Sequence, residues 1–263
     1  MIFVRVLIKF LFYKLINKAN STKERIIINH LFSKSFKFSN KFVNDRLIFL
    51  KFFKSFFKIK VVKSKTIFSY GHPIIFDSNS NSKEIRLEYL KHYKGLVNLN
   101  FISYQNLLYF ENHLQKIFFL VLIFPLVLFS FFVSQFYENR SSFALIYEYP
   151  IVLNNLLIKL KSNNINELYY FSIFEKESNF FSDFIMKNNV LVNKISSDTP
   201  LALWNQNILC NNLILCNYYQ REECDFYKDS ILTETIEFWG PELSFNYKNF
   251  YNNDTSTPIN TLG

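Results

Sequence analysis

The chain has 263 residues, of which 49% are hydrophobic and 19% aromatic, and its net charge is +9. It contains only four glycines and no CxxC, HExxH or GxSxG motif, which excludes a glycine-rich phosphate loop and the common metal and nucleophile motifs. The abundant residues (Phe, Tyr, Ile, Asn and Lys) have AT-rich codons. We therefore attribute much of the count of 33 phenylalanines to the composition of the gene.

The first 18 residues are apolar but interrupted by Arg5, Lys9, Lys14 and Lys18, so they cannot cross a membrane as one uncharged run. Their lack of acidic residues is typical of a basic organellar start segment. A helix packed between partners, with its lysines reaching solvent, explains the same pattern.

Residues 40–60 predict an amphipathic helix. Lys51, Lys54 and Lys58 recur at helical spacing, and phenylalanines occupy the remaining surface. Three interpretations compete for these lysines: contact with anionic lipid headgroups, cardiolipin among them, contact with ribosomal RNA phosphates, or a solvated face in a multi-subunit assembly. They are the candidate lipid or phosphate contacts of the chain.

The next segment predicts a strand over residues 61–70, a turn at 71–73 and an exposed loop over 77–83. Residues 84–93 predict a helix, because acidic residues stand early and basic ones late in the segment. A second helix is expected to begin near Ser103 and to continue into the apolar stretch that follows. The four histidines of the chain lack the spacing of a metal pair, and His113 is expected to contact headgroups or water, or more rarely a haem or quinone edge.

The stretch from Ile117 to Tyr137 has no charged residue and suits a transmembrane helix. Its 21 residues would extend roughly 31 Å as a helix, which matches the hydrocarbon thickness of a bilayer. Pro125 is tolerated in such a helix. A buried helix or strand pair of a soluble core is the alternative.

Beyond this stretch, helices are expected at 150–162, 165–174 and about 179–187, and strands at 190–195 and 231–238, with two short apolar runs between 208 and 219. The three cysteines allow at most one disulfide, and three buried free thiols are the favoured interpretation. The acidic cluster includes Glu222, Glu223, Asp225 and Asp229. It is a solvated loop, or a patch that attracts a basic carrier protein.

Charge is distributed unevenly along the chain. Residues 1–116 contain 21 Lys and Arg against six Asp and Glu, whereas residues 138–263 contain nine against 15. This asymmetry predicts a single-pass protein of mainly α fold with some β, oriented by the positive-inside rule. The expected parts are a basic matrix-side region (1–102), the transmembrane helix with its leading turns (103–137) and an acidic intermembrane-space domain (138–263).

In composition and layout the whole chain resembles the orphan open reading frames of protist mitochondrial genomes, those of ciliates especially. The resemblance implies a mitochondrial inner-membrane protein with its N-terminal side in the matrix, and no site residue can be transferred from it. We expect a non-catalytic accessory subunit of a respiratory-chain complex that takes part in electron transport, such as cytochrome c oxidase or a supercomplex. Its expected partners are other subunits and the lipid bilayer, and no cofactor or metal is expected. The alternatives are a mitochondrial ribosomal protein that binds ribosomal RNA and an ATP synthase membrane subunit.

Overall fold

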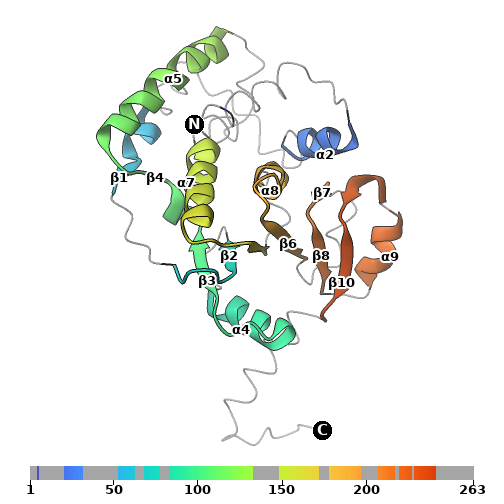
Figure 1. Ribbon diagram of the computed structural model, residues 1–263. Coiled ribbons are helices and arrows are strands. Elements are labelled where there is room, and N and C mark those ends of the chain that lie inside the picture. Colours follow the sequence, from blue (N-terminus) through green and yellow to red (C-terminus); the bar gives the residue numbers. More distant parts are fainter. Residues whose placement is uncertain are drawn as a thin grey trace, which may run out of the picture.

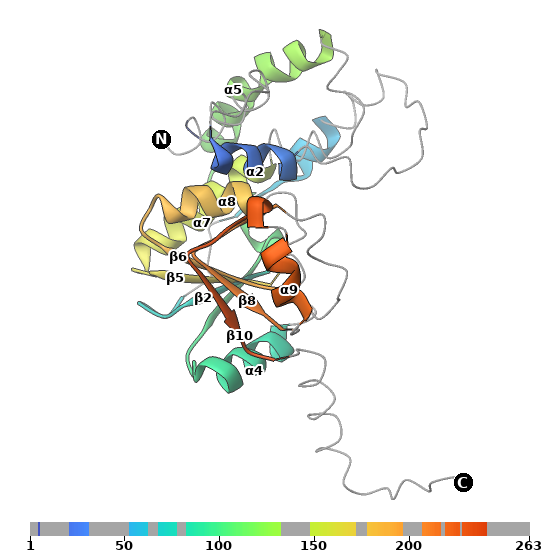
Figure 2. The same cartoon turned by 90° about the vertical axis from the view of Figure 1, so that its right-hand side faces the viewer.

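A computed structural model describes ten separate parts of the chain. They are residue 5 and residues 21–31, 53–62, 68–77, 83–132, 148–171, 178–196, 207–216, 219–226 and 228–240. Figures 1 and 2 show these parts as ribbons, and all statements below concern them.

The centre of the fold is a six-stranded sheet in which every neighbouring pair is parallel, in the order β10-β8-β6-β5-β2-β3 (Figure 1). Most of these strands are short apolar runs whose residues are buried on both faces, which is the pattern of a parallel sheet covered by helices. The strands are β2 (Ile74–Asp77), β3 (Asn100–Ser103), β5 (Glu167–Tyr170), β6 (Leu191–Ile195), β8 (Asn212–Leu215) and β10 (Thr235–Phe238).

The strand order changes direction between β2 and β5. The chain first moves outward from β2 to β3, then returns past β2 and continues from β5 to β10. Right-handed crossovers then place the helix of the first connection on one face of the sheet and the later helices on the other. Figure 2 shows this arrangement, with α4 below the sheet and α7 and α8 above it. The fold is therefore a doubly wound α/β fold.

The upper face is covered by α7 (Tyr149–Ser162) and α8 (Ser178–Met186). Nearly every residue of α7 from Tyr149 to Leu160 is buried, because a second layer of elements covers the side of α7 that faces away from the sheet. α2 (Thr22–Leu31) lies on α8, where Lys23 pairs with the buried carboxylate of Asp183 at 2.8 Å. The backbone amide of Glu24 bonds the Ser21 hydroxyl at 3.2 Å and so caps the start of α2.

The second layer consists of α5 (His113–Phe132), a helix of residues 53–58, the 3-10 turn η2 (Gln105–Leu107) and a two-stranded parallel sheet of β1 (Lys60–Val61) and β4 (Tyr109–Phe110). One buried side chain of α7 joins this layer to the domain. The amide nitrogen of Asn155 donates to the carbonyl oxygens of Leu107 at 2.8 Å and Tyr109 at 2.9 Å.

The lower face is covered by α4 (Lys83–Lys94), whose Tyr89 and Leu90 are fully buried against the sheet. The Tyr89 hydroxyl donates to the Gly240 carbonyl at 3.0 Å, directly after β10. Gly240 has φ +92°, a backbone conformation that residues with a side chain rarely adopt, so glycine is favoured at this position.

The remaining elements lie beside β8 and β10. They are α9 (Tyr219–Phe226), η5 (Lys228–Ser230) and a second small parallel sheet of β7 (Ile208–Leu209) and β9 (Ile231–Leu232). The buried Cys224 of α9 belongs to the same core cluster as residues of α7 and α8.

The prediction of a mainly α, single-pass transmembrane protein is wrong. β2 and β3 precede α5 in the chain and β5 follows it, yet β2 is hydrogen-bonded to both strands. A bilayer crossing would hold the two flanks about 30 Å apart, so they could not share one sheet. Within the described ranges we find no helix whose length and apolar character suffice for a membrane crossing. Residues 133–137 of the expected span lie outside those ranges.

Two predictions of local secondary structure are also wrong. The helix expected at 165–174 is instead the strand β5, flanked by Asn164 with φ 51°. The helix expected to run from Ser103 is interrupted by β3, η2 and β4, and α5 begins only at His113. Asn112 defines this start, since its side chain accepts a hydrogen bond from the Gln115 amide at 2.7 Å.

The strand expected over 61–70 is wrong where it can be compared, because β1 ends at Val61 and residues 62 and 68–70 form no strand, and residues 63–67 lie outside the described ranges. Of the helix expected over 40–60, residues 53–58 are helical and residues 40–52 lie outside the described ranges.

Five further expected elements agree with the structure. The helices expected at 84–93, 150–162 and 179–187 are α4, α7 and α8, and the strands expected at 190–195 and 231–238 are β6 and the pair β9 and β10.

Candidate functional site

The helix of residues 53–58 carries exposed lysines on the outside of the second layer. Phe53 packs against Phe124 of α5, with ring centroids 6.2 Å apart, and Phe56 is stacked on Phe119 at the same distance. This apolar side fixes the helix on α5 and leaves Lys54 exposed on the opposite side. Lys58 and Lys60 continue the exposed positions toward β1.

Lys116 of α5 holds the carboxyl end of this short helix. Its ammonium group donates to the carbonyl oxygens of Phe57 at 3.0 Å and Ile59 at 2.7 Å. These carbonyls form the negative end of the helix dipole, so a cation is favoured there. Partial burial lowers the pKa of Lys116. The lysine thus has a structural role that its sequence position at the expected membrane interface did not suggest.

We call the exposed Lys54, Lys58 and Lys60 the lysine strip. No carboxylate pairs with any of the three among the described residues. Lys54 and Lys58 are one helical turn apart and Lys60 follows in β1, so the strip offers exposed cations that suit the phosphates of a nucleic acid or of anionic lipids. Of the lysines singled out from the sequence, Lys54 and Lys58 lie in this strip, whereas Lys51 lies outside the described residues.

The crevice at the switch in strand order is a second candidate, because doubly wound sheets bind ligands at the carboxyl ends of their strands at this point. Here β2 ends at Asp77, which is buried, and Arg86 of α4 pairs with it at 2.9 Å. The Arg86 guanidinium also lies 4.6 Å from the centroid of the Phe171 ring, directly after β5. Both the charge and the flat face of Arg86 are therefore engaged within the fold.

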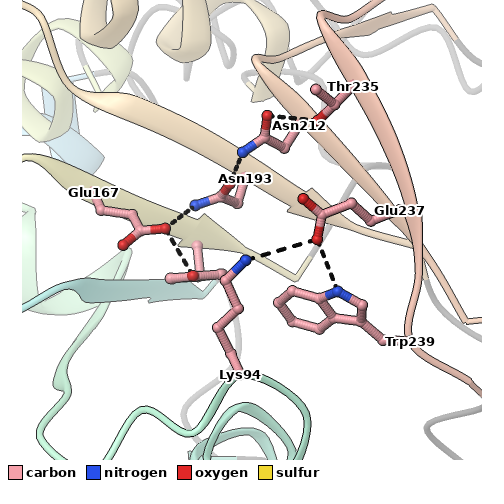
Figure 3. Close-up of polar contacts among 8 residues, drawn as sticks. Lys94, Glu167, Asn193, Asn212, Thr235, Glu237 and Trp239 are labelled. Atoms are coloured by element: carbon pink, nitrogen blue, oxygen red, sulfur yellow. Dashed lines mark hydrogen bonds and ion pairs between the residues drawn. The ribbon is translucent and has the colours of Figure 1, made fainter.

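A row of polar side chains crosses the lower face of the sheet near the amino ends of four strands (Figure 3). The Thr235 hydroxyl donates to Asn212 at 2.7 Å, the Asn212 amide donates to Asn193 at 2.7 Å, and the Asn193 amide donates to Glu167 at 2.9 Å. Tyr169 donates to the same Glu167 oxygen at 2.7 Å. All donors therefore point toward one carboxylate, and we call this series the polar row.

The same face carries a second ion pair next to the polar row. Glu237 of β10 lies 3.7 Å from the ammonium of Lys94 and accepts a hydrogen bond from the Trp239 indole at 2.9 Å (Figure 3). The Lys94 ammonium lies 5.2 Å from the centre of the Trp239 ring. This cluster attaches the end of α4 to β10 and is a structural contact.

A buried polar cluster lies on the upper face at the start of α8. The Lys194 ammonium donates to the Asn179 side chain at 2.6 Å and to the Ser178 hydroxyl at 3.2 Å. Asn179 also accepts from the Leu209 amide at 2.9 Å, so it ties β6 to β7. Burial raises the pKa of the neighbouring Cys210 thiol, although the positive charge of Lys194 opposes this effect.

The remaining residues that the sequence singled out do not come together. Cys210, Cys216 and Cys224 are buried and unbridged, which confirms the prediction of three free thiols. In the acidic cluster, Glu222 and Asp225 are exposed on α9 and Asp229 is exposed in η5. No group of three or more His, Cys, Asp and Glu side chains within the described parts is arranged to hold a metal ion.

Sequence reasoning missed the polar row, the Asp77–Arg86 pair and the role of Lys116. The asparagines before the apolar runs of β7 and β8 were visible, and Asn212 is one of them, but the alignment of the polar row depends on the register of four strands. No family model, curated protein or solved structure matches this chain.

Proposed function

We propose that the chain is a non-catalytic RNA-binding protein of a mitochondrial ribosomal particle. The observation that carries this proposal is the lysine strip: Lys54, Lys58 and Lys60 are exposed. Lys54 and Lys58 are on the helix that packs on α5 and is capped by Lys116, and Lys60 is in β1. RNA binding by such a surface depends mainly on contacts between cations and phosphates. The excess of positive charge in residues 1–116 extends the same character along the chain.

The fold supports this choice over the accessory subunit of a respiratory complex. That hypothesis took the charge asymmetry as evidence for two sides of a membrane, and one sheet now contains strands from both halves of the chain. The ribosomal alternative needs the basic charge but no membrane crossing. It also expects the apolar stretch to be buried in protein: Phe119 and Ile123 of α5 are buried in the domain core, whereas Ile117, Phe118, Val121 and Phe124 are exposed.

The salt dependence of RNA binding tests the role of the lysine strip. We would replace Lys54, Lys58 and Lys60 together with glutamine and measure affinity for mitochondrial ribosomal RNA over a range of salt concentrations. Three lost phosphate contacts reduce the slope of log K against log salt by about 2 to 3, at roughly 0.7 to 0.9 per contact. An unchanged slope would overturn the assignment of the strip.

A control variant with the same change in net charge shows whether RNA affinity depends on the lysine strip or on the net charge of the whole protein. Lys91, Lys161 and Lys228 are exposed on α4, α7 and η5, away from the strip, and their replacement with glutamine should reduce the slope by less than about 1. Equal effects of the two triple variants would show that affinity follows net charge alone.

Sedimentation of mitochondrial lysates tests the assembly. The tagged chain should sediment with a ribosomal subunit in a sucrose gradient and should move to lighter fractions after ribonuclease treatment. Migration with oxidase, dehydrogenase or ATP synthase activity on native gels would instead favour a subunit of those complexes.

A further inference from the structure

One exposed aromatic side chain lies beside the lysine strip. Phe57 is in the same helix as Lys54 and Lys58, and 60% of its surface is exposed. It is the most exposed phenylalanine in the part of the chain that the structure describes. Phe56, its neighbour in the helix, is fully buried, and Phe53 is half-buried. A gene rich in AT codons supplies many phenylalanines, but it does not determine which of them stays exposed among lysines.

Helical geometry places two lysines next to the Phe57 ring. Residues three and four apart on a helix are surface neighbours, with about 5 to 6 Å between their Cβ atoms. Lys54 is therefore a neighbour of both Phe57 and Lys58, which follow it by three and four residues. At 3.6 residues per turn, the three positions together cover roughly 100° of the helix surface. The exposed ring and the two exposed cations thus share one side of the helix.

Other aromatic side chains hold the Phe57 ring in place. Phe57 is stacked on Phe53, with ring centroids 6.3 Å apart and planes at 28°. Phe56 meets Phe57 edge-on, with centroids 5.9 Å apart, and Phe53 packs against Phe124 of α5. A further flat ring that stacked on Phe57 would extend this series. Because Phe57 is already held by its neighbours, a ligand that stacks on it costs little side-chain freedom.

We propose that Phe57 is a stacking platform for an unpaired RNA base, and that Lys54 and Lys58 bind the phosphates next to this base. Proteins that bind single-stranded nucleic acid combine cations along the backbone with aromatic side chains on which bases stack. Duplex RNA cannot use such a platform, because its bases are stacked within the double helix. The ligand class is therefore single-stranded RNA. The proposal rests on the proposed function, which assigns the lysines to ribosomal RNA, and it adds which form of RNA they bind.

A membrane surface is less compatible with this side of the helix. A helix that lies on a bilayer inserts a wide apolar side and keeps its cations at the border. Here the apolar side of the helix is already covered by α5, since Phe53 packs against Phe124 and Phe56 against Phe119. Phe57 alone would remain for insertion, whereas a single flat ring is sufficient to stack one base.

The affinities for single-stranded and duplex RNA test the platform. The probes are a single-stranded RNA without internal pairing and a duplex RNA of the same length. Phe57→Ala should weaken binding of the single strand about 5- to 150-fold, which corresponds to one stacked base, and should change duplex binding less than about twofold. The slope of log K against log salt should not change, because no phosphate contact is removed. An equal loss for both probes, or no loss, would overturn the proposal.

Two further variants separate stacking from simple apolar contact. Phe57→Leu keeps an apolar side chain but removes the flat ring, so it should lose about as much affinity as Phe57→Ala, whereas Phe57→Trp should bind at least as tightly as the native protein. Tyr70→Ala is the matched control, because Tyr70 is 70% exposed in the turn before β2, and both affinities should stay within about twofold. Urea unfolding confirms that the variants fold. Full affinity in Phe57→Leu would overturn the platform.

The remaining outcomes separate this proposal from the membrane alternative and from the proposed function. Tighter binding to vesicles of phosphatidylcholine and cardiolipin than to single-stranded RNA, lost in Phe57→Ala, would overturn the platform. If replacing Lys54, Lys58 and Lys60 reduces the salt slope while Phe57→Ala has no effect, the proposed function stands and the platform fails. If Phe57→Ala weakens single-strand binding but the chain does not sediment with a ribosomal subunit, the platform stands and the ribosomal assignment fails.

Discussion

Asn193 is the centre of the polar row, and its replacement by alanine tests whether the row stabilises the sheet. The change removes a hydrogen bond to the Glu167 carboxylate at 2.9 Å and one from the Asn212 amide at 2.7 Å. A bond to a charged acceptor contributes about 2 kcal/mol and a neutral one about 1 kcal/mol. Water can reach the half-buried Glu167 and Asn212 and replace part of the lost hydrogen-bond energy. We therefore expect Asn193→Ala to lower the free energy of unfolding by about 2 kcal/mol.

Urea unfolding measures this loss, and for a chain of this size it corresponds to a fall in Tm of about 4 to 6 °C. Asn98→Ala, at an exposed position without a hydrogen bond in the described parts, should cost less than about 0.5 kcal/mol. Glu167→Gln keeps an acceptor for Asn193 but removes the charge, and about 1 kcal/mol is expected. If Asn193→Ala were no more destabilising than Asn98→Ala, the polar row would contribute nothing to stability.

Three further changes test other parts of the structure. Arg86→Met leaves the buried Asp77 carboxylate without its ion-pair partner, so urea unfolding should show a loss of about 3 to 5 kcal/mol in the free energy of unfolding. Adding Asp77→Asn removes the buried charge and should restore at least half of that loss. If Asp77→Asn restored nothing, the buried charge of Asp77 would not be the cause of the loss. Burial and the hydrogen bond to Glu167 raise the pKa of Tyr169. The neutral Tyr169 therefore stabilises the fold fully below about pH 10, and this stabilisation is lost at higher pH, by at most about 1.4 kcal/mol per pH unit. In Tyr169→Phe the free energy of unfolding should fall less steeply above about pH 10, and an unchanged fall would contradict this prediction. The third prediction concerns the buried thiols of Cys210, Cys216 and Cys224. A thiol reagent should label them at least about 100-fold more slowly in the native protein than in urea, and mass spectrometry measures both rates. Rapid labelling of the native protein would contradict their burial.

Local secondary structure was largely predictable where periodicity and capping residues agreed. α7 has Pro150 in its first turn and ends before Asn163, and α8 ends shortly before two asparagines, so both matched the expected ranges closely. Strand β2 was missed because it has only four residues between a Gly-His-Pro turn and a polar segment. So short an apolar run gives no periodic signal, and its strand character depends on pairing with β3 and β5.

The candidate site was predictable only in part. The spacing of the lysines in residues 51–58 was sufficient to predict Lys54 and Lys58 as exposed candidates. Such a prediction needs only the periodicity of a single helix. Lys60 joins them through the strand that follows, and Lys116 contributes through a hydrogen bond to carbonyls 57 residues or more away in the chain. The Asp77–Arg86 pair and the polar row likewise depend on contacts between elements, which composition and spacing do not reveal.

The fold changes what the charge asymmetry means. In a membrane protein, a basic half and an acidic half on either side of an apolar stretch indicate two compartments. In a doubly wound sheet, the chain that precedes α5 supplies one edge of the sheet and the chain that follows supplies the rest, so both halves contribute to the surface of one domain. The cations of the first half then need a partner on that same surface. A polyanion meets this requirement without a membrane, and the lysine strip is where the described structure offers three unpaired cations to it.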